Sequence, residues 1–264
     1  MKRPNGIAKK FFAALILGTC SINAQATLYE DGLMAYAVGN FAEAGSLLMS
    51  AAEQGDAGAE HMLMRMFSEG KLYAANLEKE TLKWTKKAAE RGFMTAQYAL
   101  AELYANKLGD TKAALAWYNK AADQGHPDAY FKIGALLESG AKGVRPDAAE
   151  SAHYFQIAAS EYDVFAQKGD ANSQNSLASM YEKGQGVKKN MVLAFKWYEK
   201  AALQGHAVAQ LNMGRLYLAG ISVPRDTLQA SYWLDMAAAQ GVREAEVMLS
   251  EIKQKGEEVL ALAM

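Results

Sequence analysis

The chain has 264 residues, with 28 Lys and Arg against 29 Asp and Glu, one Cys and 51% hydrophobic residues. The near-zero charge argues against a nucleic-acid binder, because neutralising phosphates requires a surplus of Lys and Arg. The single Cys excludes an internal disulfide framework and a cysteine-rich zinc site. A soluble, globular or repetitive chain fits this composition.

The first 26 residues have the layout of a secretory signal peptide. Four basic residues and no acidic one precede an apolar run over 11–22. This run is shorter than the roughly 20 residues that a bilayer span needs. Ala24 and Ala26 meet the small-x-small requirement of a signal peptidase, so we expect cleavage between Ala26 and Thr27.

Two alternatives to cleavage at this position are weaker. In a lipoprotein signal Cys20 would be acylated, but Thr19 is larger than the Gly or Ala usual before that cysteine. An uncleaved anchor ranks last. Cleavage at Ala26 removes four basic residues, which leaves 24 against 29 acidic ones, a net charge of −5 and no Cys. We therefore expect a periplasmic or secreted protein with no integral membrane span in the mature chain.

An internal repeat organises the rest of the chain. The fragment Ala-Ala-x-x-Gly recurs five times, and a sixth copy at Ala158 has its glycine later. The glycines that end these fragments are Gly55, Gly92, Gly125, Gly169, Gly205 and Gly241, at intervals of 37, 33, 44, 36 and 36 residues. Intervals this regular predict one architecture repeated, rather than the two domains that length alone suggests.

Each repeat is predicted to contain two helices. Before the Ala pair, a bulky residue four positions earlier shares its helical face, as Trp197 does with Ala201. The equivalent bulky residues are Leu47, Trp84, Trp117, Tyr154 and Trp233. After each glycine a second apolar stripe begins, best seen at Ala209, Met213 and Leu216. We name the helix after the glycine the first helix of a repeat, and the helix ending in the Ala pair the second helix.

The connections between the two helices carry stop and start signals. Glycines such as Gly184 and Gly186 end the first helix, because they adopt left-handed backbone conformations. Side chains able to cap the second helix follow them. These predicted N-caps are Asp110, Asp147, Asn190 and Asp226.

Taken together, these patterns resemble the Sel1-like repeat family. The shared motifs are Leu/Met-Gly-x-Leu-Tyr, Gly-x-Gly-Val-x-x-Asp/Asn and Ala-x-x-Trp-Tyr-x-Lys-Ala-Ala-x-x-Gly, most complete over 173–209 and 209–245. The resemblance extends from about Tyr29 to Lys253. It implies an all-α fold, a right-handed α-solenoid of Sel1-like, tetratricopeptide-like helix-turn-helix repeats. We expect one solenoid over 27–264, with about six helix pairs and a C-terminal capping helix.

No catalytic or metal-binding constellation is apparent. Three Ser-x-x-Lys matches, at 68–71, 139–142 and 250–253, lack the Lys-Thr-Gly element of serine acylases, and we interpret them as chance. The four histidines include no pair at the i, i+4 spacing of a helical zinc site. We therefore predict no enzymatic activity, no metal and no cofactor.

The surface made by stacked repeats is the candidate binding site. In related tetratricopeptide arrays the first helices line a concave face. By that analogy, the partner-binding positions flank the buried stripe: His61, Arg65, Tyr98, Glu102, Phe131, Glu138, Asn175, Ser179, Leu211 and Arg215. Tyr98, Phe131 and Leu211 would suit a peptide or a partner helix. Alternatively, adjacent helices partly cover these side chains.

The sixth copy of the repeat contains seven extra residues around 160–168. If they extend the second helix by two turns, Tyr162 and Phe165 project beyond the stack and can make a contact that no other repeat makes. A locally shifted packing register is the alternative. The sequence leaves this choice open.

The predicted function is that of an exported scaffold or adaptor that binds a protein or peptide partner and no nucleic acid. One alternative is a protein that binds or hydrolyses peptidoglycan or β-lactams, as suggested for cysteine-rich relatives of the family. Those relatives carry paired cysteines in each repeat, and this mature chain has none. A secreted virulence factor that engages a host protein is the other alternative.

Overall fold

The computed structural model describes residues 27–141 and 143–262, which are helices joined by short connections and contain no β-strand. They form two compact units divided between Gln124 and Gly125, and each is described by itself. The signal peptide predicted over 1–26, with Cys20 and Ala26, lies outside the described residues. The single solenoid over 27–264 stays a prediction.

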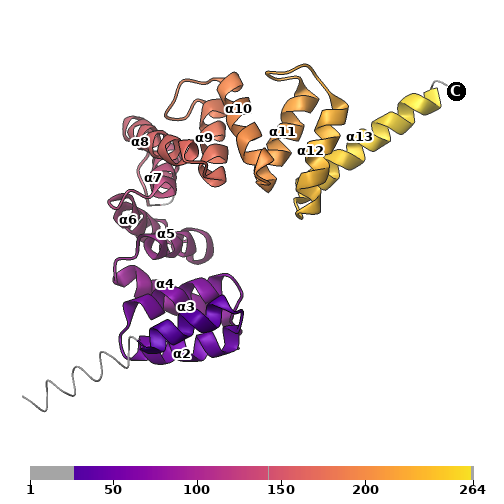
Figure 1. The fold of residues 1–264 in the computed structure, drawn as a ribbon. Coiled ribbons are helices and arrows are strands. Elements are labelled where there is room, and N and C mark those ends of the chain that lie inside the picture. Colours follow the sequence, from indigo (N-terminus) through magenta and orange to yellow (C-terminus); the bar gives the residue numbers. More distant parts are fainter. Residues whose placement is uncertain (1–26, 142, 263–264) are drawn as a thin grey trace, which may run out of the picture. The chain divides into compact units, whose positions relative to one another are not determined.

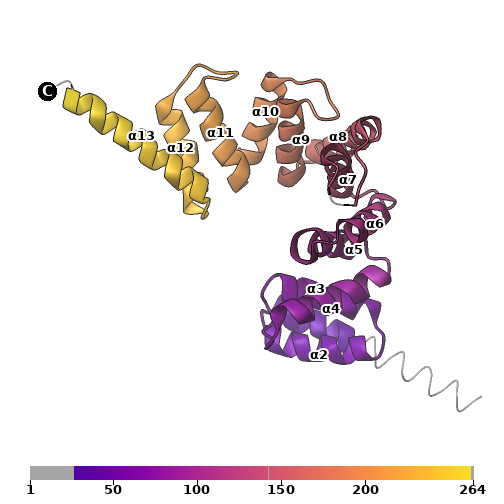
Figure 2. The same cartoon turned by 180° about the vertical axis from the view of Figure 1, so that it is seen from behind.

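In both units consecutive helices pack as hairpins (Figures 1 and 2). The first unit contains a helix over 27–37, α2 (Phe41–Glu53), α3 (Ala57–Ser68), α4 (Leu77–Glu90), α5 (Met94–Leu103), the π-helix η1 (Tyr104–Leu108) and α6 (Thr111–Ala122). The second contains α7 (Pro127–Ser139), α8 (Ala148–Gln167), α9 (Ala171–Lys183), α10 (Met191–Leu203), α11 (Ala207–Ala219), α12 (Thr227–Ala239) and α13 (Arg243–Leu262). The predicted all-α fold of paired helices is confirmed.

The predicted helix boundaries are also confirmed. The side chains of Asp110, Asp147, Asn190 and Asp226 accept hydrogen bonds from backbone N–H groups in the first turns of α6, α8, α10 and α12. These bonds satisfy donors that a helix start leaves unpaired. Ser222, at the position that Gly186 holds in the equivalent connection, has the left-handed conformation at a φ of 68°.

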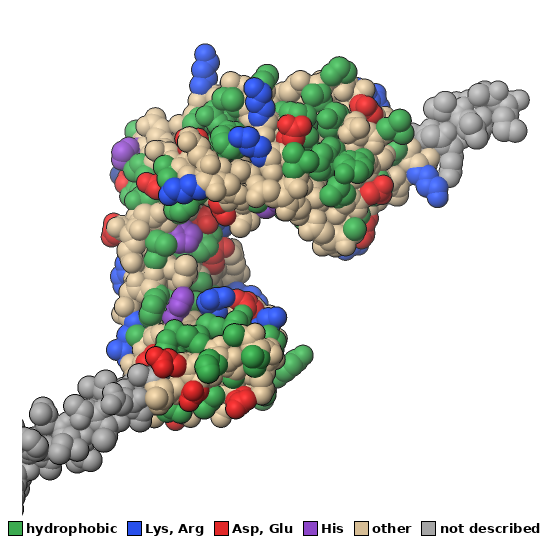
Figure 3. Space-filling model, viewed as in Figure 1, with side chains coloured by type: hydrophobic (Ala, Val, Ile, Leu, Met, Phe, Trp, Pro, Cys, Tyr) green, Lys and Arg blue, Asp and Glu red, His purple; other side chains and the backbone are tan. Residues whose placement is uncertain are grey.

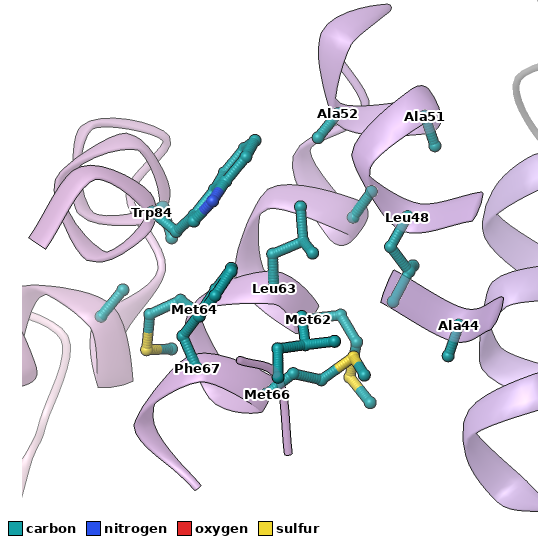
Figure 4. Close-up of a cluster of buried hydrophobic side chains, with 14 of the residues drawn as sticks. Ala44, Leu48, Ala51, Ala52, Met62, Leu63, Met64, Met66, Phe67 and Trp84 are labelled. Carbon is teal, nitrogen blue, oxygen red and sulfur yellow. The ribbon is translucent and has the colours of Figure 1, made fainter. Parts of the chain in front are cut away.

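The core of the first unit contains predicted stripe residues such as Leu63 and Trp84, but at α2 it contains Leu48, whereas the predicted Leu47 is only partly buried. Leu48 and Ala52 of α2 face Leu63 of α3, and Trp84 of α4 closes the other side (Figure 4). All four are at most 3% exposed. The alanines let the helices approach closely, while the larger side chains fill the space beside them.

In the second unit, close approach depends on glycines within the first helices. A Cβ atom on Gly134 would lie 3.0 Å from the Phe155 ring, and one on Gly214 would lie 2.6 Å from Leu234. Each glycine therefore accommodates one large side chain from the second helix of its own repeat. The large residues at these contacts, Phe155 and Leu234, each follow by one position the bulky residue that the sequence pattern named, Tyr154 and Trp233.

Neighbouring repeats are joined by hydrogen bonds between glutamines. Gln204 donates to Oε1 of Gln174 at 2.7 Å, and Gln240 donates to Oε1 of Gln210 at 2.8 Å. The buried glutamine of each pair also donates to a carbonyl at the end of the preceding second helix, as Gln210 does to Ala202. Because each amide is satisfied, the buried polar groups fix the register between repeats.

The seven extra residues around 160–168, in the copy of the repeat at Ala158, lengthen α8 to 20 residues. Tyr162 does not project: it is 3% exposed, packs in the core and donates a hydrogen bond to Asp128 at the start of α7. The predicted outward contact of Tyr162 is therefore wrong, because the longer helix shifts the packing register and brings its ring inward. Phe165 is 38% exposed, with the Lys168 ammonium over its ring.

Candidate functional site

The ten predicted binding residues all lie on the first helices α3, α5, α7, α9 and α11. Arg65, Glu138 and Arg215 are exposed, and six others are partly buried. Leu211 is different, because only 7% of its surface is exposed and it packs with Leu234 and Ala245. The expectation that Leu211 lines an open groove is therefore wrong: α12 and α13 cover it.

The predicted aromatic residues pack against neighbouring rings. The Tyr98 ring centroid lies 5.7 Å from that of Tyr118, and the Phe131 centroid lies 5.2 Å from that of Phe155. His61 stacks on Phe93 with centroids 4.5 Å apart. Adjacent helices thus cover part of each ring, as the alternative interpretation expected, and each presents only one side to a partner.

In the second unit, a polar network occupies the flanks of α9 and α11. Glu182 accepts a hydrogen bond from the Tyr198 hydroxyl at 2.8 Å and pairs with the Arg215 guanidinium at 3.5 Å. Arg215 also donates to the Asn212 side chain at 2.7 Å. Burial, followed by the bond to Glu182, raises the pKa of Tyr198, so this phenol remains a donor. The network holds a half-exposed guanidinium in one place.

Two amide oxygens near this network are shielded from solvent without a hydrogen-bond partner among the described residues. They are Oδ1 of Asn175 on α9 and Oε1 of Gln185 in the connection that follows. The Gln185 amide donates its N–H to Glu138 on α7 at 3.4 Å. The flanks therefore combine fixed charges at the surface with unsatisfied amide acceptors just beneath it.

In the first unit, the structure brings Tyr98 and Glu102 together at a cavity of about 370 Å³. The cavity is also lined by Met64, Ser68, Thr81, Thr85, Ala99, Leu103, Asn106 and Lys107. Glu102 accepts hydrogen bonds from the Tyr118 hydroxyl and from Asn106, the latter at 2.9 Å. Burial, followed by the bond to Glu102, raises the pKa of Tyr118.

The sequence analysis missed most of these cavity residues. Met64 and Thr85 each follow by one position a residue of the predicted stripes, Leu63 and Trp84, and neither was singled out. The available signal was a difference between repeats. Thr85 stands three residues before its Ala pair, and the other repeats have a large residue there: Leu48, Tyr118, Phe155, Tyr198 and Leu234. A small residue at that position predicts lost volume.

The serines of the Ser-x-x-Lys matches are engaged within their own helices. The hydroxyl of Ser68 donates to the Arg65 carbonyl at 2.9 Å, and that of Ser250 donates to the Val247 carbonyl at 2.7 Å. Ser139 makes the same kind of bond to Ala135. Such hydroxyls serve as local caps, so the geometry favours the interpretation of these matches as chance.

Within the described residues, no group of three or more His, Cys, Asp or Glu side chains could hold a metal ion. A separate search of the same part of the chain finds no helix with the length and hydropathy of a membrane span. Apolar side chains are nevertheless exposed on the second helices, including Leu228 and Tyr232 of α12. On the face that Figure 3 shows, green side chains gather over the α11 to α12 end of the second unit.

His206 caps α11 and makes its stability sensitive to pH. Its Nδ1 accepts the Ala209 N–H at 3.1 Å, which requires an unprotonated nitrogen. Burial lowers the pKa of His206 below its usual value of 6.5. Because unfolding then binds a proton, this contribution to stability is complete above the unfolded pKa and declines as pH falls below it.

We expect His206→Asp to lose less stability than the wild type between about pH 7 and pH 5, because aspartate stays ionised over that range. Aspartate is a matched replacement: Asp56 and Asp170 cap α3 and α9 at the same position, with bonds of 2.8 and 2.7 Å. Urea unfolding of both proteins at the two pH values measures the difference. Parallel losses would show that His206 does not contribute to the acid sensitivity.

The chain is similar to known repeat proteins in both sequence and structure. The model of the Sel1 repeat matches residues 59–93, 95–126, 127–163, 171–206 and 207–242, which together exceed half of the chain. The crystal structure of a Sel1 repeat protein from Oxalobacter formigenes is 32% identical, with a TM-score of 0.64, and the match covers 86% of this chain and 91% of that one. This likeness extends over nearly all of both proteins.

Two other relatives match only part of a longer protein. A protective antigen of uropathogenic Escherichia coli strains is 28% identical with a TM-score of 0.57, over 88% of this chain and 49% of that chain. The chitin synthase regulator SKT5 of Saccharomyces cerevisiae is 29% identical over 165 residues, 48% of this chain. The chain spans about a quarter of the length of that regulator, at 24%.

Proposed function

Because the chain belongs to the Sel1 repeat family, we propose that it is an exported adaptor that binds a protein or peptide partner on the flanks of its first helices. The observation that supports this most is the network around Arg215. Its guanidinium is half-exposed and is held by Glu182 and Asn212. Side chains fixed before binding lose little conformational freedom when a partner docks.

The flanks differ between repeats, as a specific binding surface requires. Packing positions such as Ala59, Ala96 and Ala209 are nearly invariant along the chain and fully buried. The flanking positions change from an imidazole at His61 to an amide at Asn175. A surface built from unlike side chains can distinguish one partner from another by charge and hydrogen bonding.

Export is part of the proposal and is supported by the sequence of residues 1–26. Osmotic-shock fractionation of a bacterial host that expresses the full gene, with N-terminal sequencing of the product, tests it. A mature N-terminus at Thr27 in the periplasmic or secreted fraction is the expected result. An intact leader in the cytoplasm would overturn this part of the proposal, whereas a lipidated N-terminus at Cys20 would keep export and replace the cleavage site at Ala26.

Replacing Arg215 should weaken partner binding more than it weakens the fold. We expect Arg215→Ala to reduce the recovered partner at least tenfold in crosslinked pull-downs from envelope extract. The free energy of unfolding should change by less than about 1 kcal/mol, as for most surface substitutions. Arg225→Ala, in the exposed connection between α11 and α12, is the matched control and should retain the partner.

Two outcomes would contradict this prediction. Equal recovery with the Arg215→Ala and Arg225→Ala variants would exclude the α9 and α11 flanks as the docking site. Failure to recover any partner with the wild-type protein, even after crosslinking, would count against the adaptor function itself. In that case nitrocefin turnover and muropeptide binding are the next assays. Turnover abolished by one substitution would replace the adaptor proposal with an enzyme.

A host-facing role is a second candidate, favoured by one observation. The E. coli relative, 28% identical over 88% of this chain, is a protective antigen. The physics of binding would be the same, with a host protein as the partner. Detection of the mature chain in the culture medium would support this role, whereas retention in the periplasm would contradict it.

A further inference from the structure

The cavity of the first unit arises where the packing of one repeat departs from that of the others. In the other repeats, the first helix supplies a small residue and the second helix a large one. Gly134 faces Phe155, and a Cβ on Gly214 would lie 2.6 Å from Leu234. The same positions hold Ala101 with Tyr118 and Ala178 with Tyr198.

In the repeat formed by α3 and α4 this pairing is reversed. The first helix carries the large residue, Met64, and the second helix carries the small one, Thr85. Both are core positions, at 4% and 1% exposure. A methionine is an unbranched, flexible side chain that does not replace a rigid ring. The cavity lies beside this reversed pair, between α3, α4 and α5, and both Met64 and Thr85 contribute to its lining.

The connection beside this space is shorter than its equivalent in the second unit. In the second unit, the connection between α9 and α10 packs on α8: Gly186 lies against the Phe155 backbone, and Val187 packs with the same cluster. The connection after α5 is different, because the π-helix η1 leads directly to Asp110. From Phe93 to Asp110 is 17 residues, against 20 from Asp170 to Asn190, so η1 takes the place of the longer connection beside α4.

The hydroxyl groups at the wall of the cavity are already bonded within their helices. Thr81 donates to the Leu77 carbonyl at 2.8 Å, and Thr85 donates to the Thr81 carbonyl at 2.7 Å. Ser68 donates to the Arg65 carbonyl. With these donors used, the hydroxyl groups are not available as donors to a ligand, and Met64 and Leu103 add apolar side chains to the lining.

The charged groups at the cavity are also paired. Glu102 accepts hydrogen bonds from Tyr118 and Asn106, and Lys107 forms an ion pair with Glu78 at 2.7 Å. A charged or strongly polar ligand would compete with these bonds and lose its own hydration. An uncharged apolar group would only displace water. The lining therefore selects apolar chemistry.

We propose that this cavity is an anchor pocket for one uncharged apolar side chain, aromatic or branched aliphatic, of a partner polypeptide. The inference rests on the proposed function and names the chemistry of one contact. A volume of about 370 Å³ is at the lower end of the range for ligand pockets, which suits a single side chain better than a long acyl chain. Asn106 at the exposed edge can bond the backbone of the bound segment.

The direct test fills the pocket while retaining ordinary packing. The double variant Met64→Ala/Thr85→Tyr gives this repeat the pair that Ala178 and Tyr198 form elsewhere in the chain, so it is expected to fold. The probe is a phage-displayed library of random linear peptides, selected on the purified mature chain. Binders should share one Phe, Leu, Ile, Met or Trp, and replacing it with Ala should weaken binding at least tenfold.

The double variant should weaken the same peptides at least tenfold, whereas Arg225→Ala, in the exposed connection between α11 and α12, should not. Circular dichroism and thermal unfolding confirm that both variants fold. If the double variant misfolds, two single variants replace it. Thr85→Val keeps the pocket and should retain binding. Ala99→Leu narrows the pocket and should weaken binding.

Three results would overturn the anchor pocket. One is peptides that bind the double variant as well as the wild type. Another is selected peptides without a shared apolar residue, or no selected peptide. The third is a wild-type cavity that binds dodecanoate but that no selected peptide occupies. This result would assign the cavity to an acyl chain. Peptide binding lost with Arg215→Ala but kept in the double variant would preserve the adaptor function and reject the pocket alone.

Discussion

Replacing Gly186 with Ala is expected to destabilise the second unit by about 3 kcal/mol. The left-handed backbone, at a φ of 69°, costs a non-glycine residue about 1–2 kcal/mol. The added Cβ would also lie 2.2 Å from the Phe155 carbonyl oxygen and 2.3 Å from its carbon. These are backbone atoms of α8, so a rotamer change cannot relieve the clash. The connection must move, which costs about 1–3 kcal/mol more.

Gly205→Ala separates the two contributions to this loss. Gly205 has a φ of 87°, but nothing lies within 4 Å of a Cβ placed on it. Its substitution should cost only the conformational part, about 1–2 kcal/mol. Urea unfolding followed by far-UV circular dichroism measures both variants. Equal losses would show that the connection between α9 and α10 does not pack tightly on α8.

The fold was largely predictable because it depends on local patterns that repeat. Asp147, Asn190 and Asp226 cap the helices predicted for them, and Trp84 is buried as its spacing with Ala88 required. Each signal lies within one helix or connection. Because the repeat occurs six times, one ambiguous copy has little effect on the predicted fold. The right-handed course of the solenoid and its single-domain organisation stay predictions.

The site was less predictable because it depends on contacts between helices. Leu211 was expected to be exposed, but α12 and α13 cover it, which a helical wheel of α11 cannot show. Tyr162 turned inward because a longer α8 brings its hydroxyl to Asp128. The cavity required comparison of Met64 and Thr85 with the same positions in other repeats. Differences between repeats, rather than the shared motif, indicate where function is encoded.

Replacing Glu60 and Arg91 together with glutamine should restore most of the stability that either single substitution removes. Arg91 donates to Glu60 at 2.9 Å, and Lys87 lies 3.6 Å from the same carboxylate, which is only 4% exposed. Arg91→Gln leaves this buried charge with one distant partner, and Glu60→Gln leaves Arg91 facing a neutral amide. Breaking one side of a buried pair destabilises a protein more than replacing both sides does.

The other junctions of the chain show why the double replacement should be accepted. Gln124 donates to Gln97 at 2.7 Å and to the Gly92 carbonyl at 3.0 Å. Arg91 makes the equivalent bond to the Gly55 carbonyl at 3.3 Å, so the two junctions share one geometry. A double-mutant cycle of unfolding free energies measures the coupling. Losses that simply add in the double variant would show that the ion pair and the glutamine pair are not interchangeable.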